Sequence, residues 1–156
     1  MGVPASPSNT FLICRGGSEL CALPIEHVVE TMRPLPIKAI PDMPSFMLGV
    51  AIIRGDPTPV VHVANLLDGV AERSPTRFVS IKLGARPLAF ALDSVIGIRT
   101  LGMEVLSDIP LLLQAVDSNR VAAIGILDTE LLLVLRSARL VPSAVWSTLD
   151  QQAQPT

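Results

Sequence analysis

Charge is scarce in this chain, and no segment concentrates it. Asp, Glu, Lys and Arg make up 17% of the 156 residues, and the formal net charge is −2. Because nucleic-acid binding requires a basic surface that neutralises phosphates, the scattered Lys and Arg residues exclude a nucleic-acid partner. No apolar run approaches the roughly 20 residues that span a bilayer, and the first ten residues lack the features of a secretory signal. We therefore expect a cytoplasmic protein without direct membrane insertion.

Residues that carry chemistry are equally few. The only histidines are His27 and His62, and the sequence has no His-x-x-x-His pair, G-x-S-x-G elbow or phosphate-binding glycine loop. A catalyst needs a base, acid, nucleophile or metal held within reach of its partners. We therefore expect no enzymatic activity, no cofactor and no metal site, and we expect His62 to be solvated or to lie near a helix cap.

Cysteine is also sparse, with Cys14 and Cys21 on either side of Gly16-Gly17. A hairpin turn at these glycines would place both cysteines on facing strands, where a disulfide is geometrically possible. The absence of an export signal favours reduced, buried thiols instead. Two cysteines without a matching His or Cys pair make a poor zinc site.

What the chain does contain is aliphatic residues. Hydrophobic residues reach 49%, although aromatic residues make up only 3%, and 14 prolines interrupt the sequence. Val, Leu and Ile must therefore fill the core, and this composition favours many short strands separated by turns. The apolar content exceeds what one compact domain needs, so part of it is expected on the surface as an interaction patch.

An internal repeat organises the chain. The segment 11-FLICRGGSELCALPIEHVVET-31 aligns without gaps on 78-FVSIKLGARPLAFALDSVIGI-98, and both predict a strand, a glycine turn, a strand and a second valine-rich run. A second pair, 51–67 and 125–141, predicts a strand, an acidic turn, a strand and a short helical turn. The repeat predicts an all-β fold of two similar units.

We place the boundary of these units near residues 71–75. Because closure removes exposed sheet edges, short strands of this kind favour small barrels, here at about residues 11–70 and 76–141. The segment from Ser143 predicts a short C-terminal helix whose Trp146 packs on a barrel. Residues 1–10 and 151–156 are expected to be flexible ends.

Arg54 stands at the end of an apolar run that otherwise belongs in the core. One interpretation is a turn residue that stiffens its own turn, for example by pairing with Asp56. The other is a surface residue that contacts a partner.

The residues also resemble a known family. The pattern P-x-x-P-x-F-x-x-G-V-x-x-x-R-G-x-x-x-P-V-V over residues 41–61, with the two aligned segments above, is similar to the CheW-like family of chemotaxis coupling proteins. The resemblance runs from about Phe11 to Val141. It implies a single CheW-like domain over residues 11–141, built from two five-stranded SH3-like β-barrels in tandem with short connecting helical turns.

The resemblance also implies a function. Proteins of this family are non-catalytic adaptors that join the regulatory domain of a CheA-type histidine kinase to the cytoplasmic tip of a methyl-accepting chemoreceptor. Carried over to this sequence, the receptor-binding positions are Val28, Gly49 and Arg54, with Glu30 close by; the resemblance assigns no kinase-binding residue. It therefore favours Arg54 as the rim of an apolar groove, where its guanidinium would hold a receptor helix.

Two positions depart from the family pattern. His62 and Arg136 stand where the family usually carries aspartate, a residue that can cap the helical turn that follows. The departures leave open a divergent competitor or regulator from an accessory chemosensory cluster. A small-ligand β-barrel is a further alternative, which the scarcity of aromatic and converging polar residues disfavours.

Overall fold

The structure is a computed structural model that describes residues 10–68, 74–101, 106–107, 121–127, 130–135 and 141–153. The first part of the chain forms β1 (Thr10–Gly16), β2 (Glu19–Pro24), the 3-10 turn η1 (Ile25–His27), β3 (Val28–Met32), β4 (Met47–Ile53), β5 (Asp56–His62) and α1 (Val63–Asp68). The later part forms β6 (Arg77–Leu83), β7 (Arg86–Leu92), β8 (Ser94–Thr100), β9 (Leu106–Ser107), β10 (Val121–Leu127), β11 (Glu130–Leu135) and α2 (Ser143–Ala153). The prediction of an all-β fold with a short C-terminal helix is confirmed.

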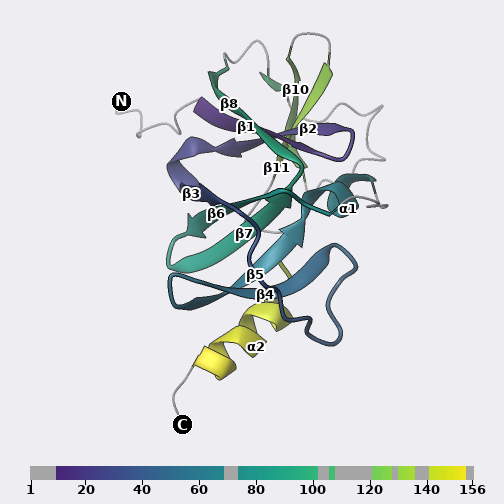
Figure 1. Cartoon of the computed structure of the whole chain (residues 1–156). Coiled ribbons are helices and arrows are strands. Elements are labelled where there is room, and N and C mark those ends of the chain that lie inside the picture. Colours follow the sequence, from purple (N-terminus) through teal and green to yellow (C-terminus); the bar gives the residue numbers. More distant parts are fainter. Residues whose placement is uncertain are drawn as a thin grey trace.

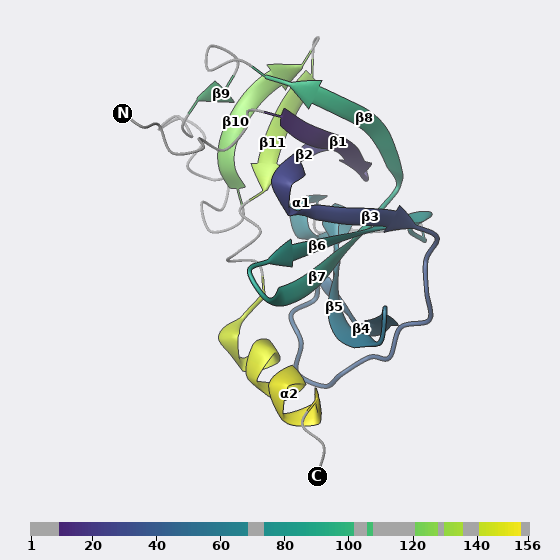
Figure 2. The same ribbon diagram turned by 90° about the vertical axis from the view of Figure 1, so that its left-hand side faces the viewer.

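The strands form two sheets that lie one above the other in Figure 1. Sheet A has the order β8-β1-β2-β11-β10-β9, and sheet B has the order β3-β6-β7-β5-β4. Figure 2 shows that both sheets are strongly curved, that α1 lies between them, and that α2 covers the end of sheet B far from sheet A. Among the described residues, no helix is long and apolar enough to cross a membrane.

The repeat predicted from the sequence is present in the hairpins. In β1–β2, Gly16 pairs with Glu19 across a two-residue turn, and in β6–β7, Leu83 pairs with Arg86 in the same way. Each turn begins with a glycine at positive φ, 63° at Gly17 and 66° at Gly84, a backbone region that glycine adopts without steric cost. The gapless alignment of these two segments therefore reflects two equivalent hairpins.

The predicted barrel boundary is wrong, because each sheet takes strands from both copies of the repeat. The third strand of the first copy, β3, pairs with β6 of the second copy, and β8 pairs with β1 of the first. Residues 11–70 and 76–141 therefore do not form separate sheets. The alignment gives the order of strands in each copy but carries no information on which hairpin receives the third strand. Sheet A also contains six described strands rather than five, the sixth being the two-residue β9.

The main core joins residues of both sheets and of α2, among them Leu23, Phe90 and Trp146. Cys14 and Cys21 are direct cross-strand neighbours within it, and both are fully buried and free. A hydrogen bond with Cys14 and burial raise the pKa of the Cys21 thiol. The expectation of reduced, buried thiols is therefore confirmed.

A second core fills the inner face of sheet B. It is built around Phe78 and Val60 with the small side chains Ala51, Ala89 and Ala91. Because successive residues of a strand point to opposite faces, β6 contributes Phe78 to this inner core and Val79 to the main core. The alternation places Ser80 on the inner face as well.

Helix α2 closes one end of the molecule. Trp146 is 7% exposed and packs in the main core, and the Arg86 guanidinium lies 5.0 Å from the centroid of its ring. The prediction that Trp146 packs on the β-structure is confirmed. The helix continues to Ala153, so residues 151–153 are helical rather than loose; residues 1–9 and 154–156 lie outside the described residues.

His62 is buried, so the prediction of a solvated side chain is wrong, whereas its place directly before Val63, the first residue of α1, agrees with the predicted cap region. It is 4% exposed at the end of β5, and its backbone N–H donates to the Phe46 carbonyl oxygen at 2.7 Å. Its Nε2 atom has no hydrogen-bond partner among the described residues. Helix α1 still begins at Val63, so the residue change at His62 does not prevent the helical turn; Arg136 lies outside the described residues.

Gly49 sits where another segment crosses β4. Its φ is 141°, and a Cβ atom there would collide with the Lys38 carbonyl oxygen and lie 2.8 Å from Cγ2 of Ile37. The crossing segment is held by backbone hydrogen bonds in both directions between Lys38 and Val50, each 2.9 Å long. The glycine at position 49 therefore serves the fold by allowing this close approach.

Gly49→Ala should destabilise the protein by about 2 kcal/mol or more, because it combines a disfavoured φ with overpacking. Gly55→Ala is the matched control, since Gly55 also has positive φ but a Cβ atom added there would meet no atom within 4 Å. The control should cost only the backbone strain of about 1 kcal/mol. Urea unfolding of both variants measures the difference, and equal losses would contradict a packing role for Gly49.

The burial of His62 predicts a pH-dependent stability. Burial lowers the pKa of His62 in the folded protein, and the Asp93 carboxylate opposes this shift in part. The unfolded chain therefore binds the proton more readily, so stability is retained above the unfolded pKa of about 6.5 and declines as the pH falls below it. Urea unfolding from pH 7.5 to 5.5 should show this decline in the wild type and a flatter profile in His62→Leu. Parallel profiles for the two proteins would contradict the prediction.

Candidate functional site

Glu30 and Arg54 form a bidentate ion pair on the surface. The Arg54 Nε atom donates to Glu30 Oε2 at 2.9 Å, and Nη2 donates to Oε1 at 2.8 Å. The Arg54 side chain is 78% exposed and that of Glu30 is 26% exposed. The parallel geometry matches the planar fork of a guanidinium to a carboxylate, which gives directional recognition as well as charge attraction.

The turn between β4 and β5 explains the position of Arg54. Ile53 pairs with Asp56, so Arg54 and Gly55 form a two-residue turn, and both have positive φ, 53° and 83°. This is a type I′ turn, whose twist matches that of the hairpin strands. The interpretation that Arg54 pairs with Asp56 is wrong, because its carboxylate partner is Glu30 on β3.

The pair connects the two edges of sheet B. Glu30 lies on β3, one edge strand, and Arg54 follows β4, the opposite edge strand. The curvature of the sheet brings these edges toward each other, as Figure 2 shows. The ion pair therefore bridges the gap between the edges at the end of the sheet where the β4–β5 turn lies.

The charge of each partner is favoured by the other. The hydrogen bond from Arg54 lowers the pKa of Glu30, and the hydrogen bond to Glu30 raises the pKa of Arg54. Both groups are solvated, and solvent screening makes such a pair a weak source of stability. In the second copy of the repeat, the position equivalent to Glu30 is occupied by Gly97. Sheet A thus forms without a carboxylate at this place, and the fold does not require one.

Val28 and Val29 differ in exposure: Val28, the predicted receptor-binding residue, faces the core, and its neighbour Val29 faces the surface. Val28 is half-buried and packs against the main core, whereas Val29 is 54% exposed. The strand pairing shifts between Val28 and Glu30, which marks a β-bulge. Val28 was predicted from the family resemblance alone, and the exposure of Val29 was missed because a bulge changes which residues of a strand face outward.

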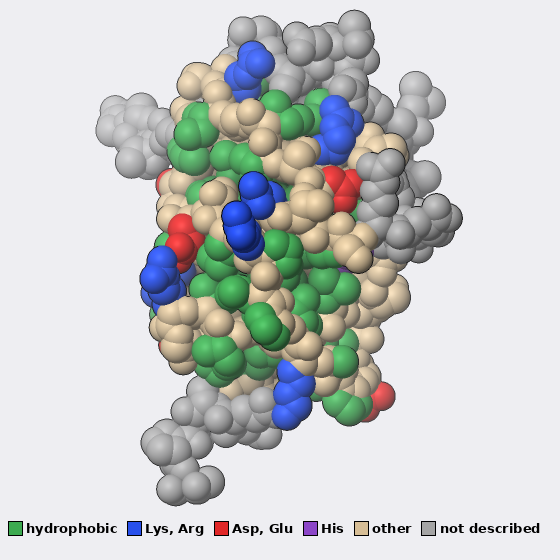
Figure 3. All heavy atoms as spheres, viewed as in Figure 1, with side chains coloured by type: hydrophobic (Ala, Val, Ile, Leu, Met, Phe, Trp, Pro, Cys, Tyr) green, Lys and Arg blue, Asp and Glu red, His purple; other side chains and the backbone are tan. Residues whose placement is uncertain are grey.

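Other exposed aliphatic side chains lie on edge strands as well. Ile52 is 61% exposed on β4, and Ile96 and Ile98 are 48% and 60% exposed on β8. Figure 3 shows hydrophobic side chains gathered over sheet B, with Lys and Arg side chains scattered around them. The surface therefore offers apolar area with separate charges, as the excess of hydrophobic residues predicted.

Gly49 does not join the other predicted site residues on this surface. It is buried near the start of β4, whereas Arg54 follows the end of that strand. The structure brings Glu30 and Arg54 together and places Val28 on the same strand as Glu30. It assigns Gly49 to the crossing of β4 by residues 37–38.

A cavity of about 170 Å³ opens beside the ion pair. Glu30, Arg54 and eight further residues line it: Val29, Ile53, Asp56, Thr58, Ser80, Ile81, Lys82 and Pro87. The exposed ion pair lies at its mouth, and the buried side chains of Thr58 and Ser80 lie deeper. Sequence reasoning missed this cavity because its lining comes from several strands that are far apart in the chain.

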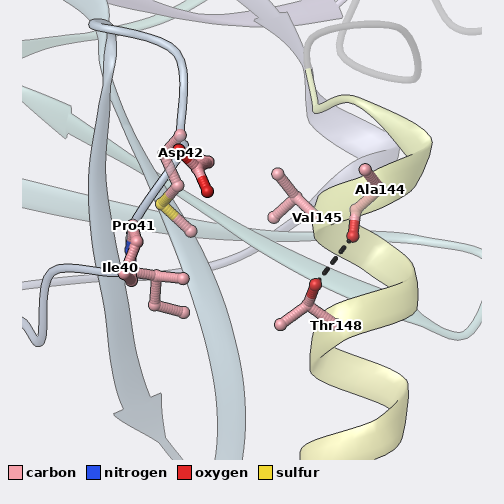
Figure 4. Close-up of a pocket in the computed structure, with 7 residues that line it drawn as sticks. Ile40, Pro41, Asp42, Ala144, Val145 and Thr148 are labelled. Atoms are coloured by element: carbon pink, nitrogen blue, oxygen red, sulfur yellow. Dashed lines mark hydrogen bonds between the residues drawn. The ribbon is translucent and has the colours of Figure 1, made fainter.

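A second cavity lies between α2 and the loop that contains residues 40–43 (Figure 4). Its helix side is formed by Ala144, Val145 and Thr148, and the Thr148 Oγ1 atom donates to the Ala144 carbonyl oxygen at 3.0 Å. The Thr148 hydroxyl is thus hydrogen-bonded within the helix and is not left free for a ligand. We interpret this cavity as a gap in the packing between α2 and the loop. Within the described part of the chain, no cluster of three or more His, Cys, Asp and Glu side chains could hold a metal ion.

Comparisons with known proteins agree with this fold. The family model for the CheW-like domain matches residues 10–145. Protein FrzA of Myxococcus xanthus is 31% identical over 101 residues, which cover 64% of this chain and 63% of FrzA. The chemotaxis protein CheW of Helicobacter pylori is 27% identical over 79 residues, which cover 49% of this chain and 48% of that protein. The matches thus span about half to three fifths of these relatives.

A solved structure shows the same architecture. The scaffolding protein TtCheW from Thermoanaerobacter tengcongensis superposes with a TM-score of 0.71 at 20% sequence identity, over 83% of this chain and 89% of that one. At this identity the superposition establishes the fold. Together with the family match over residues 10–145, it shows that this chain belongs to the CheW-like domain family.

Proposed function

We propose that this chain is a non-catalytic chemotaxis adaptor that couples a CheA-type histidine kinase to the cytoplasmic tips of chemoreceptors. Membership of the CheW-like family supports a role as a scaffold, and the relative from Helicobacter pylori is named as a chemotaxis protein. The solved neighbour is described as a scaffolding protein. The pairing of kinase and receptor is our inference for this chain.

The Glu30–Arg54 pair is the observation that carries the receptor side of the proposal. An exposed ion pair contributes little to folding, and sheet A forms with Gly97 at the equivalent of Glu30. A charged pair that the fold does not require, placed beside the exposed Val29, is suited to contact a partner. With Nε and Nη2 of Arg54 bound to Glu30, its Nη1 group can donate to a helix while its aliphatic stem lies on apolar surface.

The apolar part of the contact comes from exposed side chains on the edge strands. Val29 on β3 and Ile96 on β8 occupy equivalent positions in the two copies of the repeat. Apolar anchors with a charged rim are typical of surfaces that bind an amphipathic helix. An adaptor must hold both partners at once, so the kinase contacts a different surface from the one around Glu30 and Arg54.

Reversing the charge at position 54 tests the receptor contact. Arg54→Glu should weaken binding of a purified receptor-tip fragment by about tenfold or more, because repulsion replaces attraction at a partly desolvated contact. Thermal stability should change little, since the side chain is 78% exposed. Kinase binding should be unchanged. Calorimetric titrations against the receptor fragment and the kinase regulatory domain, taken separately, measure both affinities.

The double variant Glu30→Arg/Arg54→Glu separates a partner contact from a merely structural pair. It restores an intramolecular ion pair with the charges exchanged. If Arg54 contacts the receptor, the double variant stays as defective as Arg54→Glu; recovery of wild-type receptor affinity would contradict the contact. If the receptor fragment and the kinase domain compete for the wild-type protein, it cannot couple them. The protein would then be a competitor of such complexes rather than an adaptor.

The two neighbouring valines should respond differently to the same change. Val29→Ser should lower receptor affinity with little effect on stability, because Val29 is 54% exposed. Val28→Ser should lower the free energy of unfolding by about 1–2 kcal/mol, because it removes a half-buried apolar group that packs on the main core. Thermal unfolding and the same titration distinguish the two. Equal stability losses would show that the bulge does not separate their roles.

A further inference from the structure

The cavity beside the Glu30–Arg54 pair contains a buried serine whose hydroxyl has no partner among the described residues. Ser80 lies in the wall of the cavity beside Glu30 and Arg54 and is 6% exposed. Its Oγ atom is buried and has no hydrogen-bond partner among the described residues. Burying a hydroxyl without a partner costs free energy, so a serine at this position is unfavourable in the free protein.

The neighbouring hydroxyl is the internal comparison. Thr58 lines the same cavity and is 1% exposed, but its Oγ1 atom donates to the Asp56 carbonyl oxygen at 3.0 Å. The cavity therefore contains one satisfied hydroxyl and one free hydroxyl. The Ser80 hydroxyl can donate one hydrogen bond and accept others, and a rotation about its Cα–Cβ bond would present the buried Oγ atom to a group bound in the cavity.

The size and walls of the cavity restrict what can enter. Its volume of about 170 Å³ resembles the cavities of roughly 150 Å³ that admit a benzene-sized group. Val29, Ile53, Ile81 and Pro87 supply apolar surface. The occupant thus has the size of one side chain, with an apolar stem and a polar end that reaches Ser80.

The charges around the cavity select a neutral polar end. The lining contains two acidic residues, Glu30 and Asp56, and two basic residues, Arg54 and Lys82, so its formal charge sums to zero. Glu30 and Arg54 already satisfy each other. A charged end would lose hydration on entering the cavity, and a lining of zero formal charge favours neither sign, whereas an amide or hydroxyl loses less.

We propose that this cavity receives a single neutral, hydrogen-bonding side chain of the bound receptor tip, a carboxamide in the first instance, and that Ser80 binds its polar end. A carboxamide both donates and accepts, which matches the capacity of the serine hydroxyl. The receptor as source of this side chain rests on the proposed function. The exposed Glu30–Arg54 pair then forms the mouth of the pocket as well as the charged rim of the interface.

The proposal predicts that stability and binding respond in opposite directions to one substitution. Ser80→Ala removes a buried hydroxyl without a partner, so the melting temperature should be equal or higher. Affinity for the receptor-tip fragment should fall roughly three- to tenfold, the value of one neutral hydrogen bond. Ser80→Leu fills the cavity and should weaken binding by about tenfold or more. Ser147→Leu, an equal change at an exposed position of α2, is the matched control and should bind like the wild type.

A small-molecule probe tests the cavity without the receptor. Propanamide, titrated into the wild-type protein, should shift the backbone amide resonances of Ser80 and Ile81, and it should not do so in Ser80→Leu. Propionate, with the same carbon skeleton and a negative charge, should cause smaller shifts at these positions.

The outcomes distinguish this proposal from the proposed function. Receptor affinity unchanged in Ser80→Ala overturns the pocket, even if Ser80→Leu fails to fold, while leaving the adaptor role intact. If the wild type does not bind the receptor fragment, the proposed function fails, and the propanamide titration alone decides whether the cavity is a binding site. Absence of shifts at Ser80 in that titration overturns the pocket.

Discussion

The exchange of third strands between the two copies of the repeat is the constraint on which the rest of this structure depends. β3 leaves the β1–β2 hairpin through η1 and pairs with β6, and β8 leaves the β6–β7 hairpin and pairs with β1. Asp93 stands where the chain crosses toward sheet A, where its carboxylate accepts a hydrogen bond from the Gly17 N–H at 2.9 Å. Neither sheet is complete without the other copy, so the two units fold as one domain.

The exchange also determines where the functional surface lies. Because β3 is an edge strand of sheet B, the Glu30 side chain can reach Arg54 at the opposite edge while its backbone pairs with β6. The type I′ turn after β4 presents Arg54 from that opposite edge, and the curved sheet brings both side chains to hydrogen-bonding distance. The pair therefore depends on a tertiary arrangement, although each residue carries only local signals in the sequence.

Sheet B combines a tight interior with an open end. Small residues, Ala51, Ala89 and Ala91, let the strands curve closely around Phe78, but a cavity of about 170 Å³ remains beside Ser80. A pocket that is closed on its sides by strands and open at its mouth is preorganised, because binding requires no rearrangement of the backbone. Burying the Ser80 hydroxyl without a partner lowers stability, and binding sites commonly carry such a cost because their polar groups are arranged for a ligand.

The sequence by itself determined the strand-rich fold, the two equivalent hairpins, the helix from Ser143 and the unusual position of Arg54 after an apolar run, whereas Glu30 was predicted through the family resemblance. These features follow from local patterns: glycine turns, apolar periodicity and a charged residue after an apolar run. Only the tertiary structure decided that each sheet takes strands from both copies, that Val29 rather than Val28 is exposed, that Gly49 supports a crossing segment, and that Ser80 lines a cavity. Pairing partners, bulges and cavity walls join residues that are distant in the chain, and their energies depend on burial and contact geometry that no local pattern encodes.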